Sequence, residues 1–369
     1  MSTLLETHSQ MRPFTEKSLG TKATLEWLWS YPAHAKLVPH AISIAETRHE
    51  LLPSKLEEKS KHLRKCLLMK SLLLSATNDK LLGAMKKASI KAIPLKGPIL
   101  ANRLYGGLHH RPFGDIDILV EPAQLGKAKK LLLKAGFIEV TRNPRLFHLE
   151  FTRPHGSGTH LHLELHRRLI GYAIGGDHLA FGIAGSKGFS EWCWERANSE
   201  EDHWQLKEED ELLYLCLHLA KHLIMERKTY SSGHSCSSLL LARDIQLALT
   251  RWKFDREEFL ATIARFHLEV PVSLALAFTF RWFAIAEPTL EALAERVTPR
   301  QSRRFLNWAD DARADSRETA EDVGDRLQMV IEAFAMCDRW SDRLKILPMV
   351  ASEFMYRSWA NAIPRKAED

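Results

Sequence analysis

Residues 113–120 read FGDIDILV and set two aspartates, Asp115 and Asp117, into an apolar run that predicts a buried strand. Residues two apart on a strand point to the same side, so Ile116 and Ile118 would face a core and the aspartates would share the opposite face. Two carboxylates this close repel unless a cation compensates them, and aspartate is disfavoured in strands. The pair favours a metal site over two solvated aspartates, although the spacing alone leaves both open.

A third acid, Glu164, lies in a second segment with strict alternation. Residues 160–166 read HLHLELH, so the leucines share one face and the polar side chains share the other. If this strand neighbours the aspartate strand, three acids converge, and two divalent ions about 3.5–4 Å apart can then act on a phosphate. Taken alone, Glu164 is more typical of an exposed edge-strand residue. His166 shares its face and would orient Glu164, contact a substrate or face solvent.

A turn upstream has residues suited to phosphate. Lys96 and Gly97 precede a proline, which favours the first position of a helix, so we expect a helix over 98–105. Glycine lets the backbone approach a ligand closely, and the free N–H groups at a helix start attract phosphate. Lys96 would add positive charge, although most such turns bind nothing. Arg111, just before the first aspartate, would either reach the phosphates or lie on the surface.

The surrounding patterns predict an α+β fold with a small mixed sheet. Further expected elements are a helix over 122–135, strands over 137–140 and 146–151, and a turn over 153–158.

The chain is expected to divide into three parts. A helical lead-in covers 1–89, the mixed-sheet core covers 90–200, and an all-helical domain covers 201–369. The core ends in a glycine-rich stretch, 171–188, that has neither of the familiar nucleotide-loop motifs. We interpret this stretch as a mobile connection or a lid.

Charge and cysteine usage exclude several classes of protein. The 369 residues carry a net charge of +6 and five cysteines that form no CxxC pair, so neither a disulfide framework nor a zinc ribbon is expected. The 52 basic residues interleave with 46 acidic ones, so nucleic acid is not indicated as a partner. The longest apolar stretch, 270–286, contains Arg281 and predicts a buried helix instead of a membrane span. We expect a cytoplasmic protein without a membrane partner.

Two pairs of polar residues in the helical part give weaker indications of function than the acids do. His218 and His222 lie four apart, as in zinc peptidases, but the glutamate of HExxH is missing, so zinc is disfavoured there. Arg243 and Asp244 follow a serine-rich loop, and the pattern gives them no role.

Several segments together resemble the uncharacterised nucleotidyltransferase family within the DNA polymerase beta superfamily. They read IPLKGPILANRLY over 93–105, RPFGDIDILV over 111–120, LELH over 163–166, WERA over 194–197 and ELLYLCLHLAKH over 211–222. The resemblance covers about residues 88–249, with weaker similarity on both flanks. The combination is specific, whereas any one segment is not.

The resemblance implies a minimal nucleotidyltransferase core with Asp115, Asp117 and an acid on a later strand as ligands of Mg²⁺ or Mn²⁺. Glu164 occupies the position of that acid, where aspartate is usual. Lys96 and Gly97 stand where the superfamily has a glycine-serine turn that contacts the triphosphate. The implied reaction moves a nucleoside monophosphate from an NTP to an acceptor hydroxyl or phosphate and releases pyrophosphate. The acceptor would be a small molecule, a peptide, a protein or RNA.

Two other hypotheses stay open. The same fold can serve as a catalytically inactive nucleotide-sensing or regulatory module, because fold does not fix function. The variant turn at Lys96 and the glutamate at position 164 motivate this alternative, which predicts NTP binding without pyrophosphate release. A basic, mostly helical nucleic-acid-binding protein would show affinity that falls steeply with salt, but no stacked aromatic or basic motif supports it.

Overall fold

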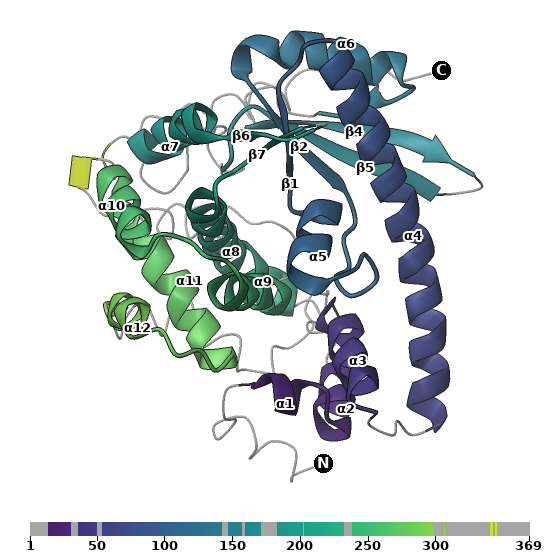
Figure 1. Ribbon diagram of the computed structural model, residues 1–369, viewed down its shortest axis with the longest axis vertical. Coiled ribbons are helices and arrows are strands. Elements are labelled where there is room, and N and C mark those ends of the chain that lie inside the picture. The colour runs from purple at the N-terminus through teal and green to yellow at the C-terminus, as the bar shows by residue number, and fades with distance from the viewer. Residues whose placement is uncertain are drawn as a thin grey trace.

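The computed structural model describes most of the chain up to residue 298. The described residues are 14–30, 36–49, 54–141, 147–156, 159–170, 183–201, 203–231, 238–298, and 301, 306, 340–341 and 344. Figure 1 shows a sheet with the long helix α4 (Ser54–Lys87) and α6 (Leu125–Lys134) on one side. Helices α5 (Gly97–Tyr105) and α8 (Glu208–Ser231) lie on the other side.

The main sheet has five strands in the order β1-β2-β5-β4-β3. Their bounds are β1 Ala92–Leu95, β2 Ile116–Val120, β3 Ile138–Glu139, β4 His148–His155 and β5 Thr159–His166. β2 and β5 run parallel, whereas the other neighbours run antiparallel. The expected mixed sheet and α+β class are therefore confirmed. A second, two-stranded ladder joins β6 (Asn198–Ser199) to β7 (Trp204–Gln205).

Successive side chains of β2 and β5 pack into two different hydrophobic cores, one on each side of the sheet. The apolar side chains of β2 and β5 that face α4 and α6 include Ile116, Ile118, Leu163 and Leu165. Leu119 packs instead into a larger core on the opposite side of the sheet. Because successive residues alternate along a strand, Asp117 and Glu164 also point to this opposite side. The two acids therefore face α5 and α8.

The larger core joins the two ends of the described chain. Helices α1 (Glu16–Leu19), α2 (Lys22–Ser30) and α3 (Val38–Thr47) contribute to it together with the later helices. Those are α7 Ile183–Arg196, α8, α9 Ser238–Arg251, α10 Arg256–Phe266, α11 Glu269–Trp282 and α12 Pro288–Ala294. The Phe14 amide donates to the Trp282 carbonyl oxygen at 2.6 Å, next to a backbone bridge from Phe14 to Phe283. The N-terminal helices are thus tied to the C-terminal region, and the three-part division at 89 and 200 stays a prediction.

Several expected boundaries differ from the structure. β2 begins at Ile116 instead of at position 113, so Asp115 lies just before the strand. The turn expected over 153–158 is wrong for its first three residues, because β4 continues through His155 and pairs with β5 up to that point. Among the described residues, β3 pairs with β4 only at Phe151 and Thr152. β4 is therefore an edge strand beyond that pair, where a proline is tolerated.

The expected buried helix is confirmed as α11 (Glu269–Trp282), most of whose side chains are buried, but it ends four residues before the expected limit at 286. No helix within the described ranges is both long and apolar enough to cross a membrane. Of the glycine-rich stretch 171–188, residues 171–182 lie outside the described residues, and the remainder opens α7.

Candidate functional site

The three predicted acids come together on the sheet face that points toward α8. Asp117 and Glu164 are paired residues of the parallel strands β2 and β5, and Asp115 precedes β2 by one residue. One carboxylate oxygen from each of the three lies within 4.8 Å of the others. Three carboxylate oxygens are the donors that hard divalent cations prefer, so this donor set fits such an ion.

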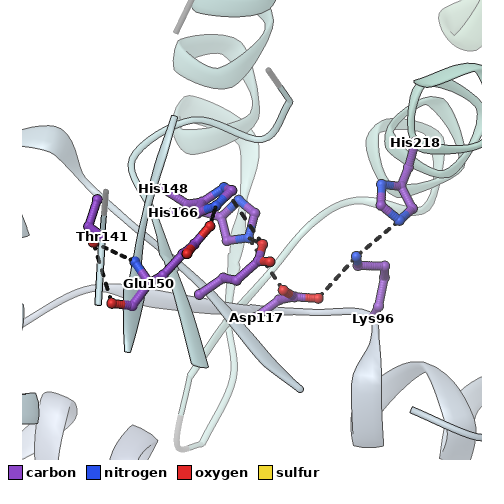
Figure 2. Close-up of polar contacts among 8 residues, drawn as sticks. Lys96, Asp117, Thr141, His148, Glu150, His166 and His218 are labelled. Atoms are coloured by element: carbon purple, nitrogen blue, oxygen red, sulfur yellow. Dashed lines mark hydrogen bonds and ion pairs between the residues drawn. The ribbon is translucent and has the colours of Figure 1, made fainter. Parts of the chain in front are cut away.

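Lys96 lies against the acids, at the point where β1 ends. The preceding residue, Leu95, pairs with Asp117 across the β1–β2 ladder. The ladder places the Lys96 ammonium 3.0 Å from Asp117 Oδ2, as Figure 2 shows. The Lys96 backbone has φ +53° and ψ −127°, a conformation that costs a non-glycine residue roughly 1–3 kcal/mol. A strained residue that holds a charge beside three acids is typical of a functional position.

Gly97 follows with φ +45° and begins α5. A Cβ atom at this position would meet nothing within 4 Å. The glycine therefore serves the backbone conformation and leaves open space at the start of the helix. The predicted helix over 98–105 is confirmed, with its first turn beside Lys96.

The charges of the acids are unevenly compensated. Burial raises the pKa of Asp117, but Lys96 and His166 outweigh burial and hold the pKa below its usual range. Burial lowers the pKa of Lys96, but the charges of Asp117, Tyr214, Asp115 and Glu164 together outweigh burial, so the pKa of Lys96 lies above its usual range. Repulsion from Asp117, followed by burial, raises the pKa of Asp115 to about 6. No hydrogen bond or ion pair reaches the Asp115 side chain from the described residues, so Asp115 is the acid that gains most from an added cation.

His166 holds two of the acids together, as one of its sequence-based interpretations proposed. Its Nε2 lies 3.2 Å from Glu164 Oε2 and 3.4 Å from Asp117 Oδ1. Burial lowers the pKa of His166, but its hydrogen bonds to Asp117 and Glu164 outweigh burial and raise it. Burial raises the pKa of Glu164, but its hydrogen bond with His166 and the charges of His166 and His148 together outweigh burial and lower the pKa to about 2. His166 therefore positions both carboxylates.

A second histidine extends the site along β4. His148 pairs with His166 across the β4–β5 ladder, and its Nε2 lies 3.2 Å from Glu150 Oε1. Burial, and then the charge of His166, lowers the pKa of His148. The Glu150 amide donates to Thr141 Oγ1 at 2.8 Å, which fixes this part of β4 (Figure 2). The sequence reasoning missed His148, although it lies in the alternating segment expected over 146–151.

One face of α8 forms a basic and aromatic wall opposite the acids. Tyr214, His218 and Lys221 follow helical spacing, and the Lys96 ammonium donates to His218 Nε2 at 3.2 Å. Lys221 Nζ lies 4.9 Å from the centre of the Phe147 ring. Burial lowers the pKa values of His218 and Lys221. The spacing 214, 218 and 221 is a signal that could have identified this face from the sequence.

Zinc at His218 and His222 was disfavoured from the sequence. Their rings lie 4.5 Å apart in an edge arrangement, but the pair belongs to neither group of potential metal ligands among the described residues.

Arg111 lies near the acids but points to a different partner. Its Nε donates to Asp244 Oδ1 at 2.8 Å and its NH2 to Oδ2 at 2.7 Å, with both side chains buried. Tyr105 donates its hydroxyl to the same Oδ1 at 2.7 Å. This bidentate pair ties the segment before Asp115 to α9 and gives Asp244, which had no role in the sequence analysis, a structural one. Phosphate binding by Arg111 stays a prediction, and it would compete with Asp244.

A pocket of about 530 Å³ lies away from the acids, between α3, the end of α5 and α9. Its lining residues are His40, Ser43, Ile44, Thr47, Arg48, Tyr105, His110 and Arg251. Tyr105 ends α5, whereas Lys96 and Gly97 stand at its start, so the pocket and the acids lie at opposite ends of this helix. No carboxylate from the described part of the chain lines the pocket, so we take the acidic cluster as the candidate site.

Comparisons with known proteins identify a family for the chain. A family model described as "Uncharacterised nucleotidyltransferase" matches residues 21–284, a wider range than the segments that carried the resemblance. Among solved structures, the chain is similar to an antigenic nucleotidyltransferase-like protein from Paracoccidioides brasiliensis. The identity is 13%, the similarity covers 57% of this chain and 94% of that one, and the TM-score is 0.29. No curated protein matches the chain.

Proposed function

The chain belongs to the uncharacterised nucleotidyltransferase family, and from this premise we propose that it transfers a nucleoside monophosphate from an NTP to an acceptor hydroxyl. In this reaction a bond forms between the acceptor oxygen and the α-phosphorus, and the bond to the bridging oxygen breaks. Pyrophosphate leaves with the electron pair. The observation that carries the proposal is the convergence of Asp115, Asp117 and Glu164 within 4.8 Å.

The acids are the proposed ligands of Mg²⁺ or Mn²⁺. Such an ion, when bound, neutralises phosphate charge and favours ionisation of the attacking hydroxyl. The register of β2 and β5 holds Asp117 opposite Glu164, and His166 fixes the orientation of both. Each carboxylate oxygen has two lone pairs, so Asp117 can keep its contacts with Lys96 and His166 and still ligate.

The turn at the start of α5 is the proposed phosphate contact. Lys96 supplies a positive charge that its strained backbone directs toward the acids. The first N–H groups of α5, opened by Gly97, lack helical partners and attract anions. Catalysis in this class of reaction rests mainly on positioning and charge neutralisation, and both are provided by residues fixed in the sheet and in its adjoining turn.

Glu164 is proposed to ligate one of the metal ions and thereby to favour loss of the proton from the attacking hydroxyl to solvent. Its side chain is 34% exposed, whereas that of Asp117 is 5% exposed, so an incoming acceptor can approach Glu164 more readily than Asp117. Arg111 has a positioning role in this proposal, because Asp244 engages its guanidinium. The α8 wall of Tyr214, His218 and Lys221 would border the bound substrates.

The test is pyrophosphate release from each NTP in the presence of Mg²⁺ or Mn²⁺, with the intact mass of the protein followed in parallel. We expect release by the wild type, none by the double variant Asp115→Asn/Asp117→Asn, and wild-type release by the surface variant Asp79→Asn. Metal-dependent NTP binding without release, across a panel of acceptors, would favour the nucleotide-sensing alternative. Release that survives in the double variant would overturn the proposed site.

A further inference from the structure

His148, Glu164 and His166 form a second group of potential metal ligands beside the three acids. One donor atom from each lies within 4.8 Å of the others. Glu164 Oε2 lies 3.6 Å from His148 Nδ1 and 3.2 Å from His166 Nε2. The two histidines face each other across β4 and β5, so the regular sheet sets this arrangement.

Glu150 determines which nitrogen of His148 is available. An ionised carboxylate only accepts hydrogen bonds, so His148 Nε2, at 3.2 Å from Glu150 Oε1, donates. In the neutral ring Nδ1 then has a lone pair, and this nitrogen faces a second acceptor, Glu164 Oε2. His148 Nδ1 is buried and has no hydrogen-bond partner among the described residues. Two acceptors that face each other are stabilised by a cation between them.

The longer of the two distances fits a metal ion better than a hydrogen bond. Metal–nitrogen and metal–oxygen bonds of zinc are about 2.0–2.2 Å long, and tetrahedral angles then separate neighbouring donors by roughly 3.3–3.5 Å. The observed separations of 3.6 Å and 3.2 Å lie on either side of this range. A nitrogen–oxygen distance of 3.6 Å is too long for a hydrogen bond.

We propose that His148 Nδ1, His166 Nε2 and Glu164 Oε2 bind a divalent transition-metal ion of the zinc class, with Glu150 orienting His148. On binding, the ion replaces the proton through which His166 Nε2 contacts Asp117 and Glu164, and this proton is released to solvent. Imidazole nitrogens select such ions over Mg²⁺, which prefers oxygen ligands. A carboxylate that holds the outer nitrogen of a ligating histidine is the usual second partner in zinc sites. The group shares Glu164 with the acidic cluster, so Glu164 bridges two chemically different sites. This inference goes beyond the proposed nucleotidyl transfer and holds without it.

The test is metal binding by the full chain after treatment with a chelator. We expect one equivalent of Co²⁺ to bind with visible absorption bands, and Zn²⁺ to displace it. His148→Ala and His166→Ala should each weaken Zn²⁺ binding by more than about 100-fold, and Glu150→Gln by roughly 10-fold. His162→Ala, an exposed position nearer the start of β5, should bind like the wild type. Circular dichroism shows whether each variant folds. If a histidine variant does not fold, Glu150→Gln still tests the site, because Glu150 is half-exposed and its substitution should not unfold the protein.

Zn²⁺ binding by an Asp115 variant distinguishes this site from the acidic cluster. Asp115→Asn should abolish pyrophosphate release and leave Zn²⁺ affinity within about threefold of wild type, because Asp115 is not among the proposed ligands. Equal Zn²⁺ binding by wild type and by folded His148→Ala and Glu150→Gln would overturn the inference. It would also be overturned if Asp115→Asn weakened Zn²⁺ binding as much as His148→Ala, since the ion would then belong to the carboxylates.

Discussion

Asp117 and Glu164 lie directly opposite each other on the parallel strands β2 and β5. Because paired residues of neighbouring strands point to the same face, the sheet fixes the separation of these two carboxylates. Asp115 lies outside this ladder, one residue before β2. The site therefore combines two acids fixed by strand register with one acid fixed by the end of a loop.

Shortening Glu164 tests whether its length is matched to the site. Glu164→Asp retracts the carboxylate from His166 and His148 while it keeps the charge. A displacement of about 1 Å at a reacting centre can cost roughly 100-fold in rate, and we expect a loss of that size in pyrophosphate release. Glu139→Asp on β3 is the matched control and should release pyrophosphate at the wild-type rate. Turnover of Glu164→Asp within threefold of wild type would contradict the assigned geometry.

Because the backbone of Lys96 has positive φ, we expect a glycine variant at this position to be more stable than an alanine variant. Glycine adopts positive φ freely and alanine does not, and both substitutions remove the ammonium. Lys96→Gly should therefore be more stable to urea than Lys96→Ala, by about 1 kcal/mol or more. The same two substitutions at Lys91, whose φ is not positive, should show alanine as the more stable residue. An equal or reversed order at position 96 would mean that its conformation is not strained.

The pattern around the acids was predictable because strand periodicity is local. The alternation in 113–120 and 160–166 fixed which side chains share a face, and the structure confirms that Asp117 and Glu164 meet. The end of β4 was not predictable from local signals. Arg153, Pro154 and His155 resemble a turn, but tertiary pairing with β5 keeps them extended.

The contacts that distant helices make with Arg111 and Lys96 could not be predicted from the sequence either. Nothing in the sequence joins Arg111 to Asp244, which are 133 positions apart. Nor does it join Lys96 to His218, which are 122 positions apart. Such contacts depend on how α8 and α9 pack over the sheet. Local patterns therefore identified the acids, Lys96 and His166 but not the partners that α8 and α9 bring to this region.

The buried pair of Arg111 and Asp244 should dominate the stability of this region. Removing one partner leaves the other charge buried and uncompensated, which costs about 3–5 kcal/mol. We expect Arg111→Met and Asp244→Leu each to lose about this much in denaturant unfolding. The double variant should lose clearly less than the sum. Tyr105→Phe removes one hydrogen bond to Asp244 and should cost only about 1 kcal/mol. Single effects that add to within about 0.5 kcal/mol would show that the pair is not coupled.

We expect the free energy of unfolding to fall in mild acid because of the buried His40. Its Nε2 lies 2.9 Å from the NH2 group of Arg243, which only donates, and its Nδ1 is buried with no partner among the described residues. Burial, followed by the charges of Arg243, His110 and Arg251, holds the pKa of His40 well below 6.5. The folded protein therefore keeps His40 neutral at a pH where the unfolded chain already binds a proton.

The lowered pKa of His40 sets the direction in which stability changes with pH. Above pH 6.5 neither state protonates His40, and the contribution to stability is constant. As the pH falls below this value, the unfolded state gains a proton that the folded state does not, and stability falls by up to about 1.4 kcal/mol per pH unit. His40→Gln keeps an acceptor for Arg243 but cannot titrate. The free energy of unfolding, measured by urea from pH 8 to about pH 5, should therefore fall less steeply for His40→Gln than for wild type. Parallel profiles for the two proteins would show that His40 is protonated in the folded state.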